Sequence, residues 1–305
     1  MQHSRFTIDS DVRPEFTACY LRVAGDECAF IEAHTSHATP RLLAALADHG
    51  KKPEDVRWIV VTHAHLDHAA GASALVEACP NATLLAHPRA ARHLIDPSKL
   101  VASATAVYGA ERFAKLYGTI RPIPKERVRT LEDGETFALG DATLRVLHTT
   151  GHANHHFVVD DPAIETVFTG DTFGLVHPPL QKFGRFALPS TSPTNFDAAA
   201  AKDSLARVLA LGERFVAPTH FDAWEDSKVI AAQLDRFLDR AARWVDEAAK
   251  SGDTTDAMTK ALSKKWRDAI VEEAPKFGAT EMEFLSLDME LNGQGLAVAA
   301  AAKRA

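Results

Sequence analysis

Six residues, His63 to His68, constrain this chain more than any other segment, because they offer four candidate metal ligands as His-Ala-His-Leu-Asp-His. They follow a nearly continuous apolar run ending at residue 62, which predicts a strand buried on both faces. In an extended segment, residues two apart project to the same side, so His63 and His65 can hold one ion. A helix is expected to begin near Asp67 and His68. Their side chains would then point in a different direction from those of His63 and His65, which suits a second ion beside the first.

Three further candidate ligands lie where other predicted strands end. His152 follows Gly151, Asp171 follows Gly170, and His220 ends the segment Phe-Val-Ala-Pro-Thr-His. Ligands of open α/β sheets gather at the carboxyl ends of strands, so we expect these residues to converge with the first four. Each neighbouring glycine permits a backbone turn that other residues resist.

The composition agrees with a metal centre and excludes some partners. The chain has 15 histidines among 305 residues, and histidine is the commonest metal ligand. With 34 basic and 41 acidic residues and a net charge of −7, the chain lacks the basic excess typical of proteins that bind nucleic acid or acidic membranes.

Cysteine usage and hydropathy indicate the compartment. Cys19, Cys28 and Cys79 are too widely spaced for a metal-binding pair and do not form an even-numbered disulfide framework. No apolar run approaches 18 residues, and the first residues contain no apolar segment typical of a secretory signal. We therefore expect a cytoplasmic protein without a membrane span.

The order of predicted elements favours an α/β fold with helical additions. Alternating strand and helix signals extend over residues 1–225, with a helical insert at about residues 88–118. Residues 172–196, rich in proline and glycine, predict a long functional loop. After residue 226 the pattern is helical, so we expect a catalytic domain over residues 1–225 and a helical extension over 226–305. The predicted strands are 16–23, 28–31, 56–62, 83–86, 128–131, 136–139, 143–148, 157–160, 166–169 and 214–218. A further helix is predicted to be capped by Thr39 and to end before Gly50. Two other helices are predicted over residues 69–78 and 197–211.

Together, the motifs between about residues 16 and 222 resemble those of the metallo-β-lactamase superfamily, and look like those of its dinuclear glyoxalase-II and lactonase-like hydrolases. The resemblance implies a four-layer αββα sandwich with the metals at one edge between two sheets. The chain also differs from the family at two points. The family's Asp-x-Gly turn reads Glu32-Ala33-His34 here, and no residues matching glutathione binding are recognised after 226.

The resemblance also implies a ligand set, in which Asp171 bridges two ions. The first ion would be held by His63, His65 and His152, and the second by Asp67, His68 and His220. Nitrogen and oxygen ligands suit two divalent ions, with zinc expected first and iron or manganese as alternatives. His155 and His156 are expected to lie at the start of a strand or to orient ligands.

The expected reaction is hydrolysis of a small ester, thioester or lactone by a metal-bound hydroxide. Metal binding lowers the pKa of water to about 7, and Asp67 would orient the hydroxide while Asp171 bridges the ions. No Gly-x-Ser-x-Gly nucleophile motif is evident.

Other functions stay open at this point. One alternative is a non-haem iron redox enzyme of the persulfide-dioxygenase kind, which can keep much of this histidine pattern. A nuclease or phosphodiesterase is disfavoured, because such members of the superfamily generally add a large insert or a basic surface. The alternative that is not an enzyme is a non-catalytic metal-binding scaffold. The expected partner is a small molecule, without nucleic acid or membrane, and a homo-oligomer is left open.

Overall fold

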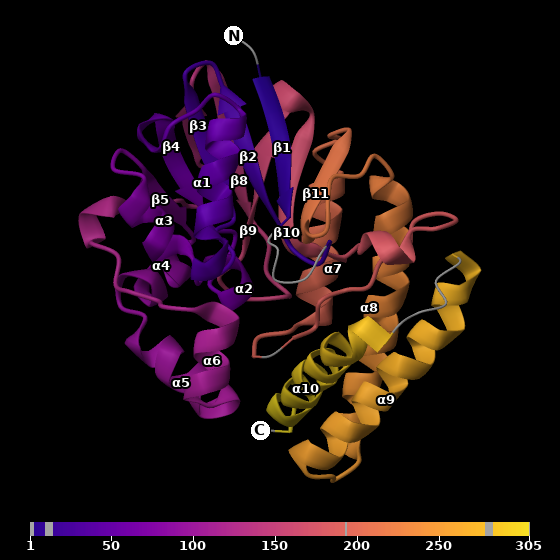
Figure 1. Cartoon of the computed structure of the whole chain (residues 1–305). Coiled ribbons are helices and arrows are strands. Elements are labelled where there is room, and N and C mark those ends of the chain that lie inside the picture. The colour runs from indigo at the N-terminus through magenta and orange to yellow at the C-terminus, as the bar shows by residue number, and fades with distance from the viewer. Residues whose placement is uncertain (1–2, 10–14, 193, 278–282, 305) are drawn as a thin grey trace. The chain divides into compact units, whose positions relative to one another are not determined.

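The computed structural model describes residues 3–9, 15–192, 194–277 and 283–304, and within them the chain forms two β-sheets and a set of α-helices (Figure 1). The first sheet has the strand order β1-β2-β3-β4-β5-β6, and the second has the order β11-β10-β9-β8-β7. This arrangement of two sheets with helices confirms the predicted α/β class.

The first sheet is antiparallel at one end and parallel at the other. Its strands are β1 (His3–Asp9), β2 (Ala18–Ala24), β3 (Glu27–Ile31), β4 (Val56–Val60), β5 (Thr83–Ala86) and β6 (Val128–Thr130). Strands β3 to β6 pair in parallel, so their carboxyl ends lie at one edge of the sheet. The segment that begins at His63 leaves the sheet at this edge.

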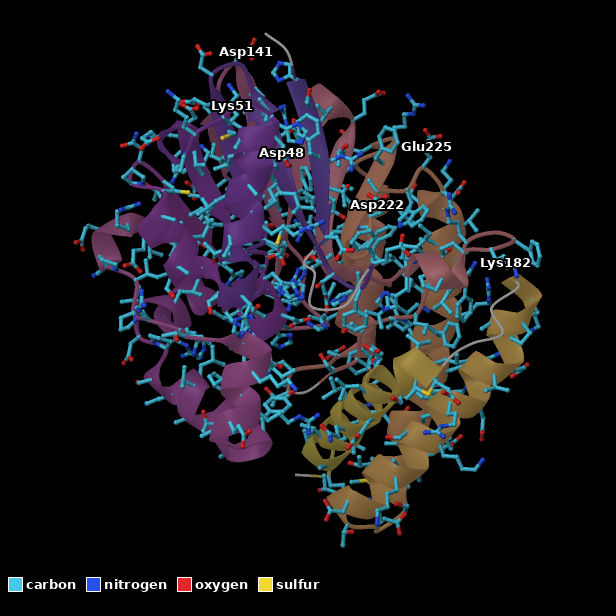
Figure 2. The ribbon with its side chains drawn as sticks, in the orientation of Figure 1. Asp48, Lys51, Asp141, Lys182, Asp222 and Glu225 are labelled. Carbon is cyan, nitrogen blue, oxygen red and sulfur yellow. The ribbon has the colours of Figure 1, made fainter. Side chains whose placement is uncertain are left out.

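Three helices cover one face of the first sheet, namely α1 (Thr39–Asp48), α3 (Ala72–Ala78) and α4 (Pro88–Ile95). Leu46, Leu75 and Leu94 from these helices pack in one core with Phe30 and Ile59 from the strands. The end of α1 is tied to the β2–β3 turn, where the Lys51 ammonium labelled in Figure 2 donates to a backbone carbonyl at 2.7 Å.

The second sheet is antiparallel in its described pairs. Its strands are β7 (Thr136–Leu139), β8 (Ala142–His148), β9 (Phe157–Asp161), β10 (Thr166–Leu175) and β11 (Phe215–His220). Tyr20 and Trp58 of the first sheet share a core cluster with Phe137, Phe157 and Phe168 of the second. The two sheets therefore face each other across a common apolar layer, as the predicted sandwich requires.

A buried ion pair crosses between the sheets. Arg22 on β2 and Asp161 at the end of β9 both have fully buried side chains, and Arg22 donates from Nε to Oδ2 at 2.5 Å and from Nη2 to Oδ1 at 3.4 Å. A buried charge is tolerated only when it is paired and hydrogen-bonded. This pair therefore helps to fix how the two sheets are joined.

We expect Asp161→Asn to lower the free energy of unfolding by about 3–5 kcal/mol, because it leaves the buried Arg22 charge uncompensated. Urea denaturation measures this change. The control is Glu77→Gln, which breaks the exposed pair of Glu77 and Arg121 and should cost less than about 1 kcal/mol. Equal losses in the two variants would contradict the structural role of the buried pair.

The chain divides into two compact units. The first comprises Met1–His148, His155–Gly170 and Glu213–Ala223, and the second comprises Thr149–Asn154, Asp171–Gly212 and Trp224–Ala305. The second unit holds α7 (Ala198–Leu209), α8 (Ser227–Lys250), α9 (Thr255–Glu273) and α10 (Ser286–Ala302), and the last three run side by side (Figure 1). The boundary at residue 225 and a functional role for residues 172–196 stay predictions.

The core of the second unit joins its helices to the long loop. Phe237, Trp266 and Leu296 pack in one cluster with Leu180 and Phe186 of the loop. Helices after residue 226 are as expected from the sequence. Across the described ranges, no helix is both long and apolar enough to cross a membrane.

The predicted insert consists of three helices, α4, α5 (Ser98–Tyr108) and α6 (Ala110–Tyr117). One strand was missed, and one local prediction was wrong. Strand β1 was not predicted, because its polar sequence gains its order from pairing with β2 along its whole length. Thr39 does not cap α1; Ala38 takes the N-cap position because a 3₁₀ turn, Ser36–Ala38, leads directly into the helix.

Two further element boundaries differ from the sequence predictions. The helix expected over 69–78 is split into α2 (Leu66–Ala69) and α3, and the gap contains Gly71. A side chain at Gly71 would lie 2.2 Å from the Ala33 carbonyl oxygen, so the chain passes close to the turn after β3. Strand β10 extends to Leu175, which places Asp171 inside the strand rather than after it.

Candidate metal centre

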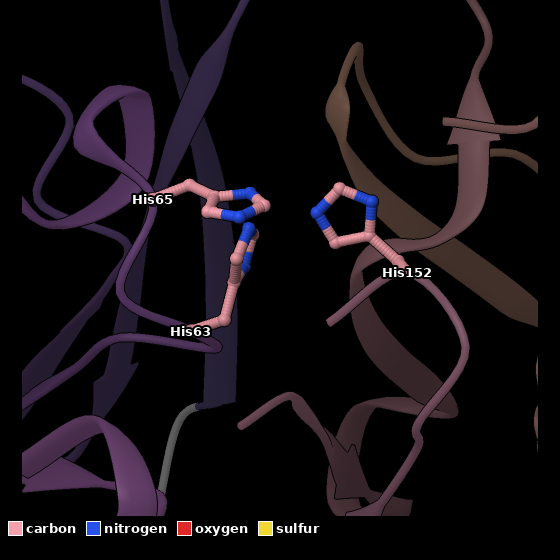
Figure 3. Close-up of side chains that lie close together, drawn as sticks. All are labelled: His63, His65 and His152. Atoms are coloured by element: carbon pink, nitrogen blue, oxygen red, sulfur yellow. The ribbon is translucent and has the colours of Figure 1, made fainter. Parts of the chain in front are cut away.

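The loop after β4 brings the first four candidate ligands together. The ring of His63 lies 4.4 Å from that of His65 and 4.0 Å from that of His68, measured between ring centroids. His63 is fully buried. Figure 3 shows His63 and His65 on this loop, with their imidazoles adjacent to each other. The alternation expected of an extended segment therefore holds for these two residues.

A second group joins the start of α2 to the end of β11. Asp67 Oδ2 lies 3.5 Å from His68 Nε2 and 3.3 Å from His220 Nε2. The segment after His220 is fixed by Thr7, which donates from Oγ1 to Asp222 Oδ1 at 2.7 Å (Asp222 is labelled in Figure 2). Asp67, His68 and His220 form a group whose ligand atoms all lie within 4.8 Å of one another.

His152 and Asp171 form a further pair of candidate ligands. Asp171 Oδ2 lies 3.4 Å from His152 Nε2, and both side chains are buried. Figure 3 shows His152, which follows the turn at Gly151. Gly151 has a φ of +119°, and a side chain there would lie 2.2 Å from the Ala201 nitrogen, so this turn requires glycine.

Hydrogen bonds orient the candidate ligands as they do in known metal sites. Nδ1 of His68 lies 3.0 Å from a Glu32 carboxylate oxygen, and Nδ1 of His220 and His152 lies 3.1 Å from the carbonyl oxygens of Phe16 and Ser190, respectively. Because these acceptors require a proton on Nδ1, they leave the lone pair on Nε2. Ligating histidines are typically held in this way.

The same three Nε2 atoms face carboxylate oxygens at 3.3–3.5 Å. Two electron-rich atoms at this distance repel each other unless a positive charge lies between them. The donor set of imidazoles and carboxylates, without thiolate, suits a divalent cation. The described residues therefore fit a divalent metal site.

Glu32 is a candidate functional residue that is visible in the sequence only as a departure from the family pattern. It is 1% exposed at the end of β3, and its Oε1 accepts from Thr62 Oγ1 at 2.5 Å and Thr219 Oγ1 at 3.1 Å, besides lying 3.0 Å from His68 Nδ1. His63 Nδ1 lies 3.1 Å from the same Thr62 hydroxyl. One carboxylate thus contacts the candidate ligand His68 and two threonines that precede His63 and His220 in the sequence. The Asp-x-Gly position was the signal that could have identified it.

We expect Glu32→Gln to weaken metal binding by about 10–100-fold, the usual cost of losing an outer partner of a ligand. An amide has one acceptor oxygen and adds two donors, so it cannot serve the donors that now meet this carboxylate. Competition with a chromogenic chelator measures the affinity. Glu27→Gln, at the other end of β3, is the control, and equal affinities in both variants would refute the role of Glu32.

The turn after β3 keeps a left-handed backbone without glycine. Glu32 has a φ of +70° and His34 a φ of +51°, values that are uncommon outside glycine and cluster at functional sites. Burial lowers the pKa of His34 to about 4. The charge of Asp67 opposes this shift, whereas those of His68 and His220 reinforce it. His34 is therefore neutral near pH 7.

Further imidazoles surround the first-unit ligands. The ring centroids of His156 and His63 are 4.9 Å apart, and His155 Nδ1 accepts from the Ala64 nitrogen at 3.4 Å. Gly170 has a φ of +49°, and a side chain there would lie 2.5 Å from His156 Nε2. That these histidines begin a strand or orient ligands stays a prediction.

Comparison with known proteins gives the family. The model of the metallo-β-lactamase superfamily matches residues 12–220. The chain belongs to this superfamily. The metallo-β-lactamase fold-containing protein ST1585 of Sulfurisphaera tokodaii is 30% identical over 169 residues, which are 53% of this chain and 59% of ST1585. The chain thus matches less than two thirds of that relative's length.

Solved structures of superfamily members share the fold. The crystal structure of ST1585 from Sulfolobus tokodaii has a TM-score of 0.63 and 25% identity, covering 78% of this chain and 87% of ST1585. The metallo-β-lactamase family protein TTHA1429 from Thermus thermophilus has a TM-score of 0.61 and 20% identity, covering 93% of this chain and 91% of TTHA1429. A B3 metallo-β-lactamase with an active-site glutamic acid has a TM-score of 0.54 and 19% identity, covering 77% of this chain and 86% of that enzyme.

Proposed function

We propose that this superfamily member is a dinuclear metal-dependent hydrolase of small esters, thioesters or lactones. The observation that carries the proposal is the orientation of His68, His152 and His220, each held at Nδ1 with Nε2 facing a carboxylate. Such histidines are prepared to bind a cation through Nε2.

His63 and His65 would hold one ion with His152, and Asp67, His68 and His220 would hold the other. Asp171 would bridge the two. Zinc is proposed first, with iron or manganese as alternatives, since the nitrogen and oxygen donors suit all three.

When bound, two divalent ions supply a water that ionises near neutral pH and a positive charge that stabilises an oxyanion. The residues of the chain position the reacting groups. The Asp67 side chain is 42% exposed, so its carboxylate can accept a hydrogen bond from an attacking water and orient it. Glu32 and the Thr62 hydroxyl hold the ligand histidines in place.

Cysteine is not proposed as a nucleophile. Burial raises the pKa of Cys28 and of Cys79 to about 12 and raises that of Cys19 well above its usual value. All three are buried free thiols, which are protonated and unreactive at neutral pH. Free thiols also support a reducing location, and the cytoplasm is proposed on that ground.

A substrate panel on the metal-loaded protein tests the function. The protein would be loaded with zinc, manganese or iron(II) and assayed with p-nitrophenyl butyrate, a thioester, a lactone, a β-lactam and a phosphodiester. We expect cleavage of the ester, thioester or lactone and its loss on chelation. Oxygen uptake with a persulfide and no hydrolysis would contradict the proposal, and so would cleavage of the phosphodiester or the β-lactam alone.

A small molecule is proposed as the partner, because a net charge of −7 disfavours a polyanion such as nucleic acid. Nuclease activity on single- or double-stranded DNA would contradict this part of the proposal.

A further inference from the structure

We propose that Asn292, on the last helix α10, positions the candidate ligand His152 through a single peptide group of the long loop. The inference rests on the proposed function, because it concerns how one ligand of the proposed centre is held. The peptide group joins Ser190 to Thr191. Nδ1 of His152 lies 3.1 Å from the Ser190 carbonyl oxygen, and Asn292 Oδ1 accepts from the Thr191 nitrogen at 2.5 Å. The imidazole and the amide therefore meet opposite ends of one peptide group.

The geometry of this peptide group carries orientation from one end to the other. The atoms of a peptide group lie close to one plane, and in the usual trans form the N–H and the C=O point in opposite directions. When Asn292 fixes the N–H, it also fixes the direction of the carbonyl that accepts from His152. Hydrogen bonds in such a chain polarise one another, so the bonded N–H makes the carbonyl a better acceptor. A better acceptor at Nδ1 makes the imidazole a stronger ligand at Nε2.

Asn292 holds the peptide group from a fixed position of its own. The Thr191 hydroxyl donates to Asn292 Oδ1 at 2.8 Å and lies 3.1 Å from the Asn292 carbonyl oxygen. Asn292 Nδ2 donates to the Asp288 carbonyl oxygen, one helical turn earlier, at 2.7 Å. The amide has a defined orientation, because its oxygen meets donors and its nitrogen meets an acceptor. Thr191 is fully buried and Asn292 is 8% exposed, so solvent has little access to these bonds.

The loop is also anchored on the other side of Ser190. Leu188 pairs with Leu175 of β10 through two backbone hydrogen bonds, at 2.7 and 3.1 Å. A side chain at Gly174 would lie 2.1 Å from the Leu188 carbonyl oxygen, so the strand and the loop are in close contact. The segment around Ser190 is therefore fixed by β10 at one end and by α10 at the other, and its carbonyl has little freedom to turn.

The sequence of α10 is unusual where the helix meets the loop. Asn292, Gly293 and Gly295 stand in a helix that ends in a run of alanines, although asparagine and glycine are poor helix formers. A side chain at Gly295 would lie 1.7 Å from the Thr191 carbonyl oxygen, and one at Gly293 would lie 2.6 Å from the Ser263 nitrogen of α9. The poor helix formers of α10 thus lie where its backbone packs closely on the loop and on α9.

Asn292→Ala and Thr191→Val test the proposal at two strengths. The first removes the acceptor of the peptide N–H, whereas the second keeps that bond and removes only the hydroxyl. In competition with a chromogenic chelator, we expect Asn292→Ala to weaken zinc binding about 10-fold, the lower end of the cost of losing an outer partner, and Thr191→Val to weaken it less. The visible spectrum of the cobalt(II)-loaded protein should shift in the same order, because it reports ligand geometry. Thr191→Ser, which keeps a hydroxyl, should bind zinc as the unmodified protein does.

Met289→Ala is the matched control for stability. Met289 lies on the same helix, about one turn before Asn292, and its side chain packs in the core of the second unit. Its truncation leaves a cavity and should lower the midpoint of urea unfolding at least as much as Asn292→Ala does. The zinc affinity and the cobalt spectrum of Met289→Ala should nevertheless equal those of the unmodified protein. An equal loss of zinc affinity in Met289→Ala would overturn the inference, since it would assign the effect to general stability.

The outcomes separate this inference from the proposed function. Zinc affinities of Asn292→Ala and Thr191→Val within twofold of the unmodified protein would overturn the inference and leave the hydrolase standing. If Asn292→Ala does not fold, a Thr191→Val protein that binds zinc as tightly as Thr191→Ser overturns the inference, and one that binds it more weakly supports it. An unmodified protein that binds zinc but cleaves no substrate would overturn the function, and the affinities would still decide on Asn292. An unmodified protein that binds no zinc would overturn both.

Discussion

Asp171→Ala is expected to reduce hydrolysis more than about 100-fold, because the loss of a ligand should exceed the 10–100-fold cost of losing a ligand's outer partner. Asp171 is buried beside His152, with Oδ2 3.4 Å from Nε2. If it bridges the ions, its loss weakens both, so the zinc content should fall from two ions per chain to one or fewer. Steady-state kinetics and mass-spectrometric metal analysis measure the two effects.

The matched control is Asp48→Ala, which makes the same change at the exposed last residue of α1 (Figure 2). It should keep the activity and the metal content of the unmodified protein. Circular dichroism should show that both variants are folded. Full activity of a folded Asp171→Ala protein would rule out the bridging role.

Asp67→Ala is expected to have an effect of similar size on activity but a different effect on metal content. Asp67 lies next to His68 and His220, the residues proposed to hold the second ion with it, so its loss should release the second ion and leave the first in place. The side chain is 42% exposed, and its removal should change the free energy of unfolding by less than about 1 kcal/mol.

Metal titration distinguishes the two aspartate variants. Asp67→Ala should bind one zinc ion tightly, whereas Asp171→Ala should bind neither ion with the original affinity. An Asp67→Ala protein that still holds two ions, or one that retains most of its activity, would contradict the assignment of Asp67 to the second ion.

Much of the fold could be predicted because local patterns agreed with the final structure. Residues 136–139 alternate in burial as a half-buried strand should, and they form β7 with those bounds. Residues 88–118 carry helical patterns that persist as α4 to α6. The strand β1 could not be predicted, because His3 to Asp9 have mixed polarity and become ordered only through pairing with β2.

The candidate ligands could be predicted because they depend on short spacings. His63 and His65 are two apart in an extended segment, and that spacing alone accounts for their adjacent rings. The role of Glu32 could not be found in this way. It depends on contacts with Thr62, His68 and Thr219, and the last of these is 187 positions away in the sequence. Long-range hydrogen bonds of this kind leave no local pattern.

The metal content of the folded protein tests the central claim most directly. The protein would be stripped with a chelator, reloaded with zinc, separated from free metal and analysed by mass spectrometry together with its protein concentration. The account predicts two zinc ions per chain, with the return of hydrolysis following their binding. A folded protein that binds no zinc, or that hydrolyses esters equally well without it, would contradict the account.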